Sequence, residues 1–191
     1  MKRVVFLVSG GGTNMENLIK RMKSGEIAAE PTLVVCNRPE AGALDRAALL
    51  RVPACVLDHE QFASRSDFDR ELANVIDSSG ADLICLAGFM RLLTPEFVNR
   101  YPKKLINIHP SYLPDFPGAH AIRDAYIAKA KETGVTVHYV DTGVDTGPII
   151  LQKKVQIYLG ETLEAVEARV HEMEYEIYPE ALNIILKENI K

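Results

Sequence analysis

The sequence predicts an α/β fold, with a mostly parallel twisted sheet and helices on both faces. Short apolar segments alternate with helix-patterned segments from the first residues onward, and this alternation is typical of a parallel sheet covered by helices. In the last third of the chain, two strand-like segments joined by a glycine-rich loop precede a long amphipathic stripe. We therefore expect an antiparallel addition to the sheet, followed by a long C-terminal helix.

Five apolar segments are the predicted strands of the parallel part of the sheet. Each is short, rich in aliphatic residues and bounded by turn residues. In chain order they are Arg3–Val8, Leu33–Cys36, Ala54–Leu57, Leu83–Leu86 and Leu105–Ile108. Pro110 should end the fifth segment abruptly, because proline cannot donate a ladder hydrogen bond. Ligands of such sheets bind beyond the carboxyl ends of the strands, so the residues that follow these segments are the first candidates for a site.

Four segments between these strands have apolar residues three and four positions apart, which predicts helices. They are Asn14–Lys23, Ala43–Leu50, Asp67–Ser79 and Pro95–Tyr101. The fourth has Thr94 as its expected N-cap and a proline at its first position, where the missing amide hydrogen costs nothing.

The remaining elements are predicted from a change in the spacing of apolar residues in the last third of the chain. Thr136–Val140 alternates as a strand, and Ile149–Ile157 is its expected partner. A long helix is predicted from Thr162 onward, and Pro179 should kink it or split it in two. The buried stripe of this helix is predicted to be Leu163, Val166, Val170, Met173 and Ile177.

Composition limits the class of protein. The chain has 191 residues, of which 47% are hydrophobic and 25% charged, which suits one soluble domain spanning 1–191. The net charge of −4 argues against nucleic-acid binding. No apolar run is long enough for a membrane span or a signal peptide, so we expect a cytoplasmic protein. Cys36, Cys55 and Cys85 lie in apolar segments and are expected to be reduced core residues.

A glycine loop, Ser9-Gly10-Gly11-Gly12-Thr13-Asn14, joins the first predicted strand to the first helix. It is not a P-loop, because no lysine follows Gly12, and Met15 stands where a dinucleotide fingerprint needs its third glycine. One interpretation is a phosphate monoester bound by Gly12, Thr13 and Asn14 at the helix N-terminus. The alternative is a tight turn whose only role is to cap the helix.

An unusually apolar turn, Ala87-Gly88-Phe89-Met90-Arg91-Leu92-Leu93, follows the fourth predicted strand. Exposing that much apolar surface is costly, at roughly 25 cal/mol per Å². The turn is therefore either packed into the core or forms one wall of a pocket for an aromatic heterocycle.

The most informative segment is Asn107-Ile108-His109-Pro110-Ser111. Side chains alternate along a strand, so Asn107 and His109 should point to the same face. An amide donor beside an imidazole suits acyl transfer, in which a developing oxyanion needs hydrogen-bond donors. The glycine-rich loop Asp141–Pro148 could fold back so that Asp141 or Asp145 raises the pKa of His109; spacing does not decide between the two.

The other four histidines have weaker signals. His138 alternates on a predicted strand and either packs or lines the site, and His120 lies close to the catalytic segment in sequence. His59 and His171 are expected on the surface.

Together these motifs resemble the phosphoribosylglycinamide formyltransferases, over almost the whole chain. The residues that carry the resemblance are Ser9–Asn14, Leu86–Arg91, Asn107–Ser111 and Asp141–Pro148. The resemblance implies a formyltransferase fold with a Rossmann-like, phosphate-binding half (1–100) and a catalytic, folate-binding half (101–191). It also implies transfer of a formyl group from 10-formyltetrahydrofolate to the glycinamide amine of a ribose-phosphate substrate in purine synthesis, with no metal.

The same resemblance implies roles for individual residues. His109 would be the general acid, Asn107 an oxyanion donor, and Asp145 the group that raises the pKa of His109. The substrate phosphate would be held by Gly12, Thr13 and Asn14, and its ribose hydroxyls by Glu174. The folate would be contacted by Arg65, Met90, Arg91, Leu92, Leu93, Asn107, Asp141, Thr142, Gly143, Val144 and Asp145.

Four alternatives remain at this stage. Formyltetrahydrofolate hydrolase shares the Asn-His-Asp set, and methionyl-tRNA formyltransferase shares the fold but needs a further domain and a basic surface. A folate- or nucleotide-binding module without catalysis and an NADP-type oxidoreductase are the other two. The expected partners are small molecules, with neither nucleic acid nor membrane, and the protein is expected to be a monomer or a homodimer.

Overall fold

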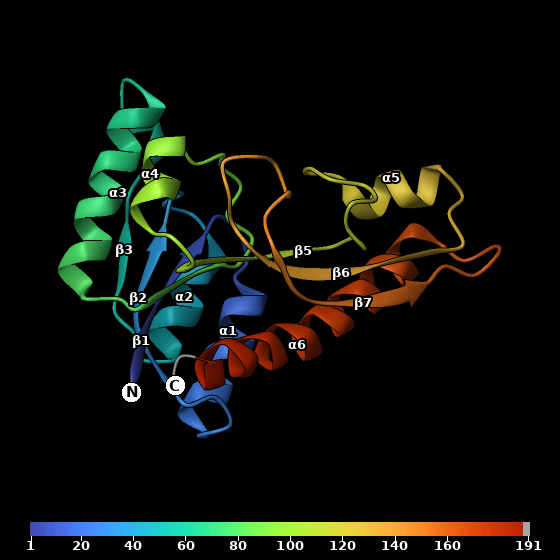
Figure 1. Ribbon diagram of the computed structural model, residues 1–191, viewed down its shortest axis with the longest axis horizontal. Helices are drawn as coiled ribbons and strands as arrows, with labels where there is room; N and C mark the ends of the chain where they lie inside the picture. The colour runs from blue at the N-terminus through green and yellow to red at the C-terminus, as the bar shows by residue number, and fades with distance from the viewer. Residues whose placement is uncertain (189–191) are drawn as a thin grey trace.

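The computed structural model describes residues 1–188, and its centre is a seven-stranded sheet of order β3-β2-β1-β4-β5-β6-β7 (Figure 1). The first five strands are parallel, whereas β6 runs antiparallel to β5, and β7 antiparallel to β6. This arrangement confirms the predicted mixed sheet. The strands are β1 Lys2–Val8, β2 Ala29–Cys36, β3 Ala54–Val56, β4 Leu83–Leu86, β5 Leu105–His109, β6 Glu132–Tyr139 and β7 Ile149–Gln156.

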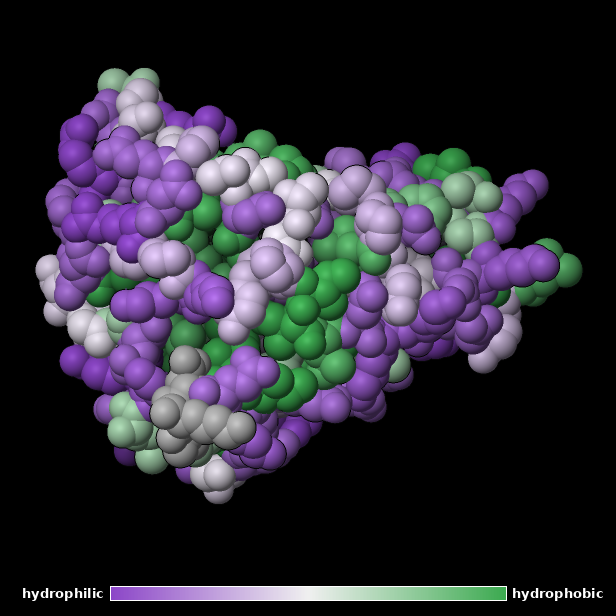
Figure 2. Space-filling model, in the orientation of Figure 1, coloured by the Kyte–Doolittle hydropathy of each residue, from purple (hydrophilic) through white to green (hydrophobic). Residues whose placement is uncertain are grey.

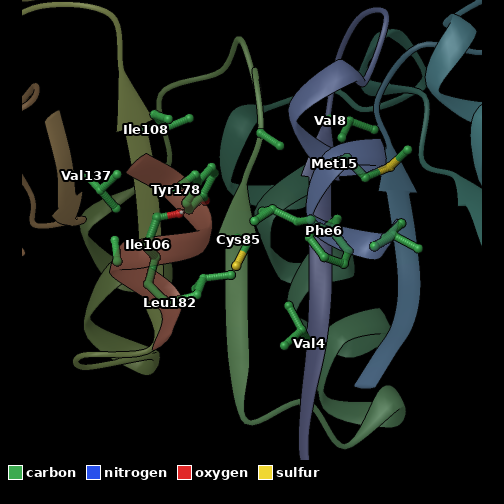
Figure 3. Packing of buried hydrophobic residues seen from close by; sticks show 14 of the residues in the cluster. Val4, Phe6, Val8, Met15, Cys85, Ile106, Ile108, Val137, Tyr178 and Leu182 are labelled. Atoms are coloured by element: carbon green, nitrogen blue, oxygen red, sulfur yellow. Dashed lines mark hydrogen bonds between the residues drawn. The ribbon is translucent and has the colours of Figure 1, made fainter. Parts of the chain in front are cut away.

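Helices cover both faces of the sheet, as expected. One core contains apolar residues of α1, α2, α5 and α6, and a second core on the opposite face contains residues of α3 and α4. Figure 3 shows part of the first core, with Met15 of α1 near Phe6 of β1 and with Tyr178 and Leu182 of α6 near Ile106 of β5. The helices are α1 Thr13–Lys23, α2 Gly42–Leu49, α3 Arg65–Ser79, α4 Pro95–Arg100, α5 Ala121–Ile127 and α6 Leu163–Glu188, with a short 3₁₀ turn at His59–Gln61.

The direction of the chain reverses between β1 and β4. From β1 the chain proceeds through β2 to β3 on one side, and then returns to place β4 and β5 on the other side. The loops after β1 and β4 meet at this switch point, where Ser9 N donates to the Gly88 carbonyl at 3.2 Å and Met90 N donates to the Ser9 Oγ at 2.8 Å. Parallel sheets bind ligands at such a crevice.

Two strands begin earlier than the sequence pattern predicts. β2 starts at Ala29 instead of Leu33, and β6 at Glu132 instead of Thr136. In β2 the extension contains Pro31, which cannot donate to the ladder, and the register with β1 shifts beside it. Thr32 Oγ1 donates to the Val4 carbonyl at 3.0 Å at this irregularity, so a side chain replaces a main-chain donor.

Two short elements were not predicted, namely the 3₁₀ turn and α5. α5 has seven residues and begins at Ala121, and within residues 1–188 no side-chain hydrogen bond caps it at the N-cap residue His120. Its core residues are Ala121, Ile122 and Ala125, so tertiary packing stabilises a helix that is too short to be stable by itself.

Pro179 was predicted to kink the last helix or to split it, and the split is wrong, because α6 continues through the proline. Proline leaves the carbonyl four residues earlier, that of Tyr175, without its helical donor. Asn17 Nδ2 donates to this carbonyl at 2.9 Å and Arg21 at 3.5 Å, both from α1. A neighbouring helix therefore satisfies the group that proline leaves open.

The predicted stripe of α6 is largely confirmed. Val166, Val170 and Ile177 are buried, whereas Leu163 and Met173 are only partly covered. Figure 2 shows a mostly hydrophilic face with a hydrophobic area where β7 and α6 lie together in Figure 1. No helix within residues 1–188 is both long and apolar enough to cross a membrane.

The buried Tyr178 connects α6 to two neighbouring strands. Its hydroxyl lies 3.0 Å from the carbonyl oxygen of Leu86 on β4 and 3.1 Å from that of Ile106 on β5. Cys36 and Cys85 are free and buried, as expected, but Cys55 is only half-buried because β3 lies at the edge of the sheet.

Candidate active site

A cavity of about 430 Å³ opens at the carboxyl ends of β4 and β5. Its walls are the apolar turn after β4, the end of β5 and the loop between β6 and β7. Every residue expected to contact folate lines this cavity: Arg65, Met90, Arg91, Leu92, Leu93, Asn107, Asp141, Thr142, Gly143, Val144 and Asp145. His109 and His138 line it as well, so the cavity joins the predicted catalytic and folate-binding residues.

His109 lies at the end of β5 and is only 4% exposed. Its Nε2 is 3.0 Å from the Phe116 carbonyl oxygen, and its Nδ1 is 3.4 Å from Asp145 Oδ2. A carbonyl and a carboxylate can only accept hydrogen bonds. Both ring nitrogens are therefore satisfied together only when each carries a proton, and this geometry suits an imidazolium.

Asp145 is held from several directions. Gly118 N donates to its Oδ2 at 2.9 Å, and His138 Nε2 lies 3.7 Å from its Oδ1. Burial acts to raise the pKa of Asp145, but the nearby His138 ring, the hydrogen bond from Gly118 and the charge of His109 outweigh it, so the pKa is lowered. The carboxylate is consequently ionised at neutral pH.

The structure decides between the two candidate aspartates. Asp141 Oδ1 accepts hydrogen bonds from Gly143 N at 3.0 Å and from Thr146 Oγ1 at 2.8 Å. Asp141 thus shapes its own loop, whereas Asp145 faces the imidazole. Asp145 itself has a φ of 54°, a left-handed conformation that aspartate tolerates better than most residues.

Gly147 allows the loop to close against β6. A Cβ at this position would lie 1.7 Å from the Tyr139 carbonyl oxygen, so no other residue fits without displacing the main chain. The glycine in the sequence motif is therefore a packing requirement that brings Asp145 to the site.

His138 is the site residue that the sequence identified only weakly. It is 2% exposed, and its Nδ1 lies 2.9 Å from the Tyr139 carbonyl oxygen. Its Nε2 is 3.3 Å from Asn107 Nδ2. His138 thus lies between Asn107 and Asp145. His138 on β6 lies directly opposite Asn107 on the antiparallel strand β5. The sequence alone does not give this pairing.

The apolar turn after β4 is partly packed into the core and partly open to the cavity. That its open part covers an aromatic heterocycle stays a prediction. Phe89 is 9% exposed and stacks on Phe68 at 6.5 Å, whereas Met90 is 65% and Leu92 58% exposed. The Arg91 guanidinium lies 4.7 Å from the Phe68 ring centroid, and its buried Nε has no hydrogen-bond partner among the residues that the structure describes. An exposed apolar rim beside a guanidinium fits a flat ligand with an anionic end.

The glycine loop begins α1 with exposed backbone. Gly12 is the N-cap, with a φ of 75° and no side-chain cap, so the first amide groups of the helix keep their capacity to bind an anion. A Cβ on Gly12 would lie 2.7 Å from that of Ala43. Gly12, Thr13 and Asn14 lie outside the cavity lining but are joined to it through the Ser9 contacts.

Glu174 of α6 reaches the same loop. Its side chain is buried, and Asn14 Nδ2 donates to its Oε2 at 3.1 Å. His171 Nδ1 lies 2.8 Å from the same oxygen. His171 is exposed, as expected, but it is a neighbour of a predicted site residue, which the sequence did not indicate.

The remaining histidines lie away from the chemistry. His120 is exposed at the start of α5 and does not line the cavity, and His59 is half-buried against Asn37, not at the surface. Within residues 1–188, no three His, Cys, Asp or Glu side chains are grouped as a metal site would require.

Residues 2–182 match the family model described as formyl transferase. The chain belongs to this family. It is 38% identical to the phosphoribosylglycinamide formyltransferase of Bacillus subtilis over 97% of this chain and 95% of that protein. It is also 40% identical to the crystal structure of glycinamide ribonucleotide transformylase 1 from Symbiobacterium toebii, with a TM-score of 0.96 over 98% of this chain and 89% of that one.

A longer relative has a different organisation. The chain is 42% identical to the trifunctional purine biosynthetic protein adenosine-3 of Drosophila melanogaster, and the match covers 97% of this chain but 14% of that protein. The similarity to the family thus extends over nearly all of this chain, and the fold prediction of a formyltransferase is confirmed.

Proposed function

We propose that this chain transfers a formyl group from 10-formyltetrahydrofolate to the glycinamide amine of 5′-phosphoribosylglycinamide, a step of purine synthesis. The observation that carries the proposal is the grouping of Asn107, His109 and Asp145 at one end of the 430 Å³ cavity. The formyltransferase relatives, similar over nearly the full chain, support the same reaction.

The cavity has the features that the folate co-substrate needs. Its apolar rim at Met90 and Leu92 would cover a flat heterocycle, and Arg65 and Arg91 lie on the same lining for an anionic end. The main-chain groups of Asp141–Asp145 would hydrogen-bond the heterocycle's edge. When bound, 10-formyltetrahydrofolate supplies the formyl group.

In this proposal the protein contributes charge stabilisation and a proton. Asn107 Nδ2 is the donor for the formyl oxygen, on which negative charge develops as the amine attacks. His109, held between the Phe116 carbonyl and Asp145, would turn its Nε2–H from that carbonyl to the reacting centre and provide the second donor there. It would deliver a proton to the departing folate nitrogen and recover one from the attacking amine, so that the net transfer is from the amine to the folate. The ionised Asp145 stabilises the imidazolium. The mechanism needs neither a metal nor a covalent intermediate on the enzyme.

The amine substrate would bind at the glycine loop. Its phosphate would be held by the amide groups that Gly12, Thr13 and Asn14 present at the start of α1, and its ribose hydroxyls by Glu174. The Ser9 contacts to Gly88 and Met90 place this loop against the cavity wall, so the two ligands would meet at the end of β5.

The proposal includes three further expectations. The partners are small molecules, the protein acts in the cytoplasm, and it is a monomer or a homodimer formed from one domain with two functional halves. Formyltetrahydrofolate hydrolase, the alternative considered from the sequence, is not favoured by the relatives, which are named as formyltransferases and purine biosynthetic proteins.

Folate absorbance during deformylation tests the proposal. We expect release of tetrahydrofolate only when 5′-phosphoribosylglycinamide is present, together with stoichiometric formylation of its amine. Release at the same rate without the amine would identify a hydrolase, and no release under either condition would leave a binding protein.

A further inference from the structure

The apolar turn after β4 is held by hydrogen bonds at its two ends and not in between. At its start, Met90 N donates to Ser9 Oγ at 2.8 Å. At its end, Thr94 N donates to Asp69 Oδ2 of α3 at 2.6 Å. Among the residues that the structure describes, the main-chain groups of residues 91–93 make no hydrogen bond. The position of residues 91–93 therefore depends on the two contacts that flank them.

These three residues form part of the cavity wall, whereas the group that holds them lies behind it. Residues 91–93 all line the cavity of about 430 Å³, and Leu92 is exposed in it. Asp69 and Thr94 do not line the cavity. A ligand in the cavity would therefore feel Asp69 only through the main chain that Asp69 holds.

The surroundings of Asp69 do not explain it as a residue for stability. Asp69 is 3% exposed, and its buried Oδ1 has no hydrogen-bond partner within residues 1–188. Burying a polar oxygen without a partner destabilises a fold, and an apolar side chain at such a position avoids that cost. The benefit of Asp69 consequently lies in the contact made by its other oxygen.

The same helix supports the turn by packing, but packing is less directional. Phe68 of α3 is fully buried, stacks on Phe89 and lies under the Arg91 guanidinium. Helices α3 and α4 lie side by side (Figure 1), and Thr94 is the N-cap of α4, where its Oγ1 accepts from Phe97 N at 3.3 Å. The hydrogen bond from Asp69 thus fixes the point at which the turn enters α4.

We propose that Asp69 is a positioning residue for the folate co-substrate. Its hydrogen bond to Thr94 N sets the main chain of residues 91–93, and with it the shape of the wall against which the flat heterocycle would pack. The amine substrate would bind at the glycine loop, so its affinity should depend much less on Asp69. The inference rests on the proposed function and adds to it a residue that touches neither substrate.

Three variants separate the hydrogen bond from the volume of the side chain. Asp69→Asn keeps an oxygen that can accept from Thr94 N. Asp69→Ala and Asp69→Leu both remove the acceptor, the first leaving space and the second filling it. Glu71→Leu is the matched control, because it removes a carboxyl group from the exposed face of the same helix, outside the cavity lining.

Steady-state kinetics with both substrates and the equilibrium Kd of tetrahydrofolate measure the effect on binding. We expect Asp69→Ala and Asp69→Leu to raise the KM for 10-formyltetrahydrofolate and the Kd of tetrahydrofolate about tenfold, because Thr94 N loses its acceptor unless the turn moves. The KM for 5′-phosphoribosylglycinamide and kcat at saturation should stay within about threefold of the wild type. Asp69→Asn should restore most of the affinity, and Glu71→Leu should match the wild type.

Amide hydrogen exchange, followed by NMR in the free protein, tests the hydrogen bond without any turnover. In Asp69→Ala, the Thr94 amide should exchange about tenfold faster than in the wild type. The Met90 amide, which Ser9 holds at the other end of the turn, should keep its rate. A general loss of stability would instead accelerate both amides together with those of β4.

Failure of this inference is distinct from failure of the proposed function. If the wild type formylates the amine but Asp69→Ala and Asp69→Leu keep its KM for the folate, Asp69 has no positioning role. Equal losses of affinity in Asp69→Asn and Asp69→Leu, or equal acceleration of exchange at Thr94, Met90 and β4, would also overturn it. Absence of formyl transfer by the wild type would instead reject the function on which the inference rests.

Discussion

The catalytic cavity and the glycine loop are two neighbouring regions built in different ways. In the cavity, side chains from β5, β6 and the β6–β7 loop contact one another, with His109, Asp145, His138 and Asn107 within 3.3–3.7 Å of a partner. At the glycine loop, the proposed binding groups are main-chain amides at the start of α1, and a single helix, α6, brings the buried carboxylate.

This difference predicts how mutations in each region should affect the kinetic constants of the enzyme. A site made of side chains loses its chemistry when one functional group is removed, although the fold remains. A site made of main-chain amides has no functional group to delete, so it is disturbed only through backbone conformation or charge. Mutations in the first region should therefore lower kcat, and mutations in the second should raise KM.

The largest effect should come from His109→Ala. Loss of the general acid and of one donor to the oxyanion should lower kcat by about 10³–10⁴-fold, while folate binding changes little because the rest of the cavity wall is intact. Steady-state kinetics and equilibrium folate binding check this expectation. The control is His120→Ala, since His120 is exposed and outside the cavity lining. A rate within tenfold of the wild type for His109→Ala would contradict the assignment.

Asp145→Asn should have the next largest effect, a decrease in kcat of about 10²–10³-fold, because the imidazolium loses its anionic partner. The lowered pKa of Asp145 also contributes to folding stability. That contribution is complete above the ordinary pKa of aspartate and is lost as the pH falls through the lowered value. Chemical denaturation from pH 7 to pH 3 should show a smaller loss of stability for Asp145→Asn than for the wild type. Parallel curves would mean that the carboxylate does not form the ion pair in solution.

Gly12→Ala should have the smallest effect on turnover and act mainly on binding. The left-handed φ of 75° and the 2.7 Å approach to Ala43 would force the loop to move, raising KM for the phosphorylated substrate about tenfold with a smaller change in kcat. Gly10→Ala is the matched control for stability, as nothing lies within 4 Å of its added Cβ. If Gly12→Ala lowered kcat and left KM unchanged, the predicted difference between the two regions would be contradicted.

The sequence predicted the sheet and the residues of the cavity well because both depend on strong local signals. The strands are short apolar segments, and the helices have apolar residues three and four positions apart. The end of β5 is marked by Pro110 directly after His109. The residues expected to contact folate came from the family resemblance, and all of them line one cavity.

What the sequence missed depends on contacts between distant parts of the chain. Alternation allowed His138 to be either a packing or a lining residue, because its partner Asn107 is set by the register of β5 and β6. Pro179 was expected to kink or split the last helix. The α1 donors that satisfy the Tyr175 carbonyl were not foreseen, because they lie more than 150 residues away in sequence. Asp141 and Asp145 were equivalent until the loop geometry separated them.

The attachment of α6 by Tyr178 has a consequence for how the protein is made. Every cavity-lining residue precedes this helix in the chain, so the ribosome adds the proposed catalytic residues to the chain before it adds Glu174. Until α6 has left the ribosome and its tyrosine has docked on β4 and β5, the hydrophobic face that it covers is bare. Completion of the binding site and burial of that face are then a single late event in biosynthesis.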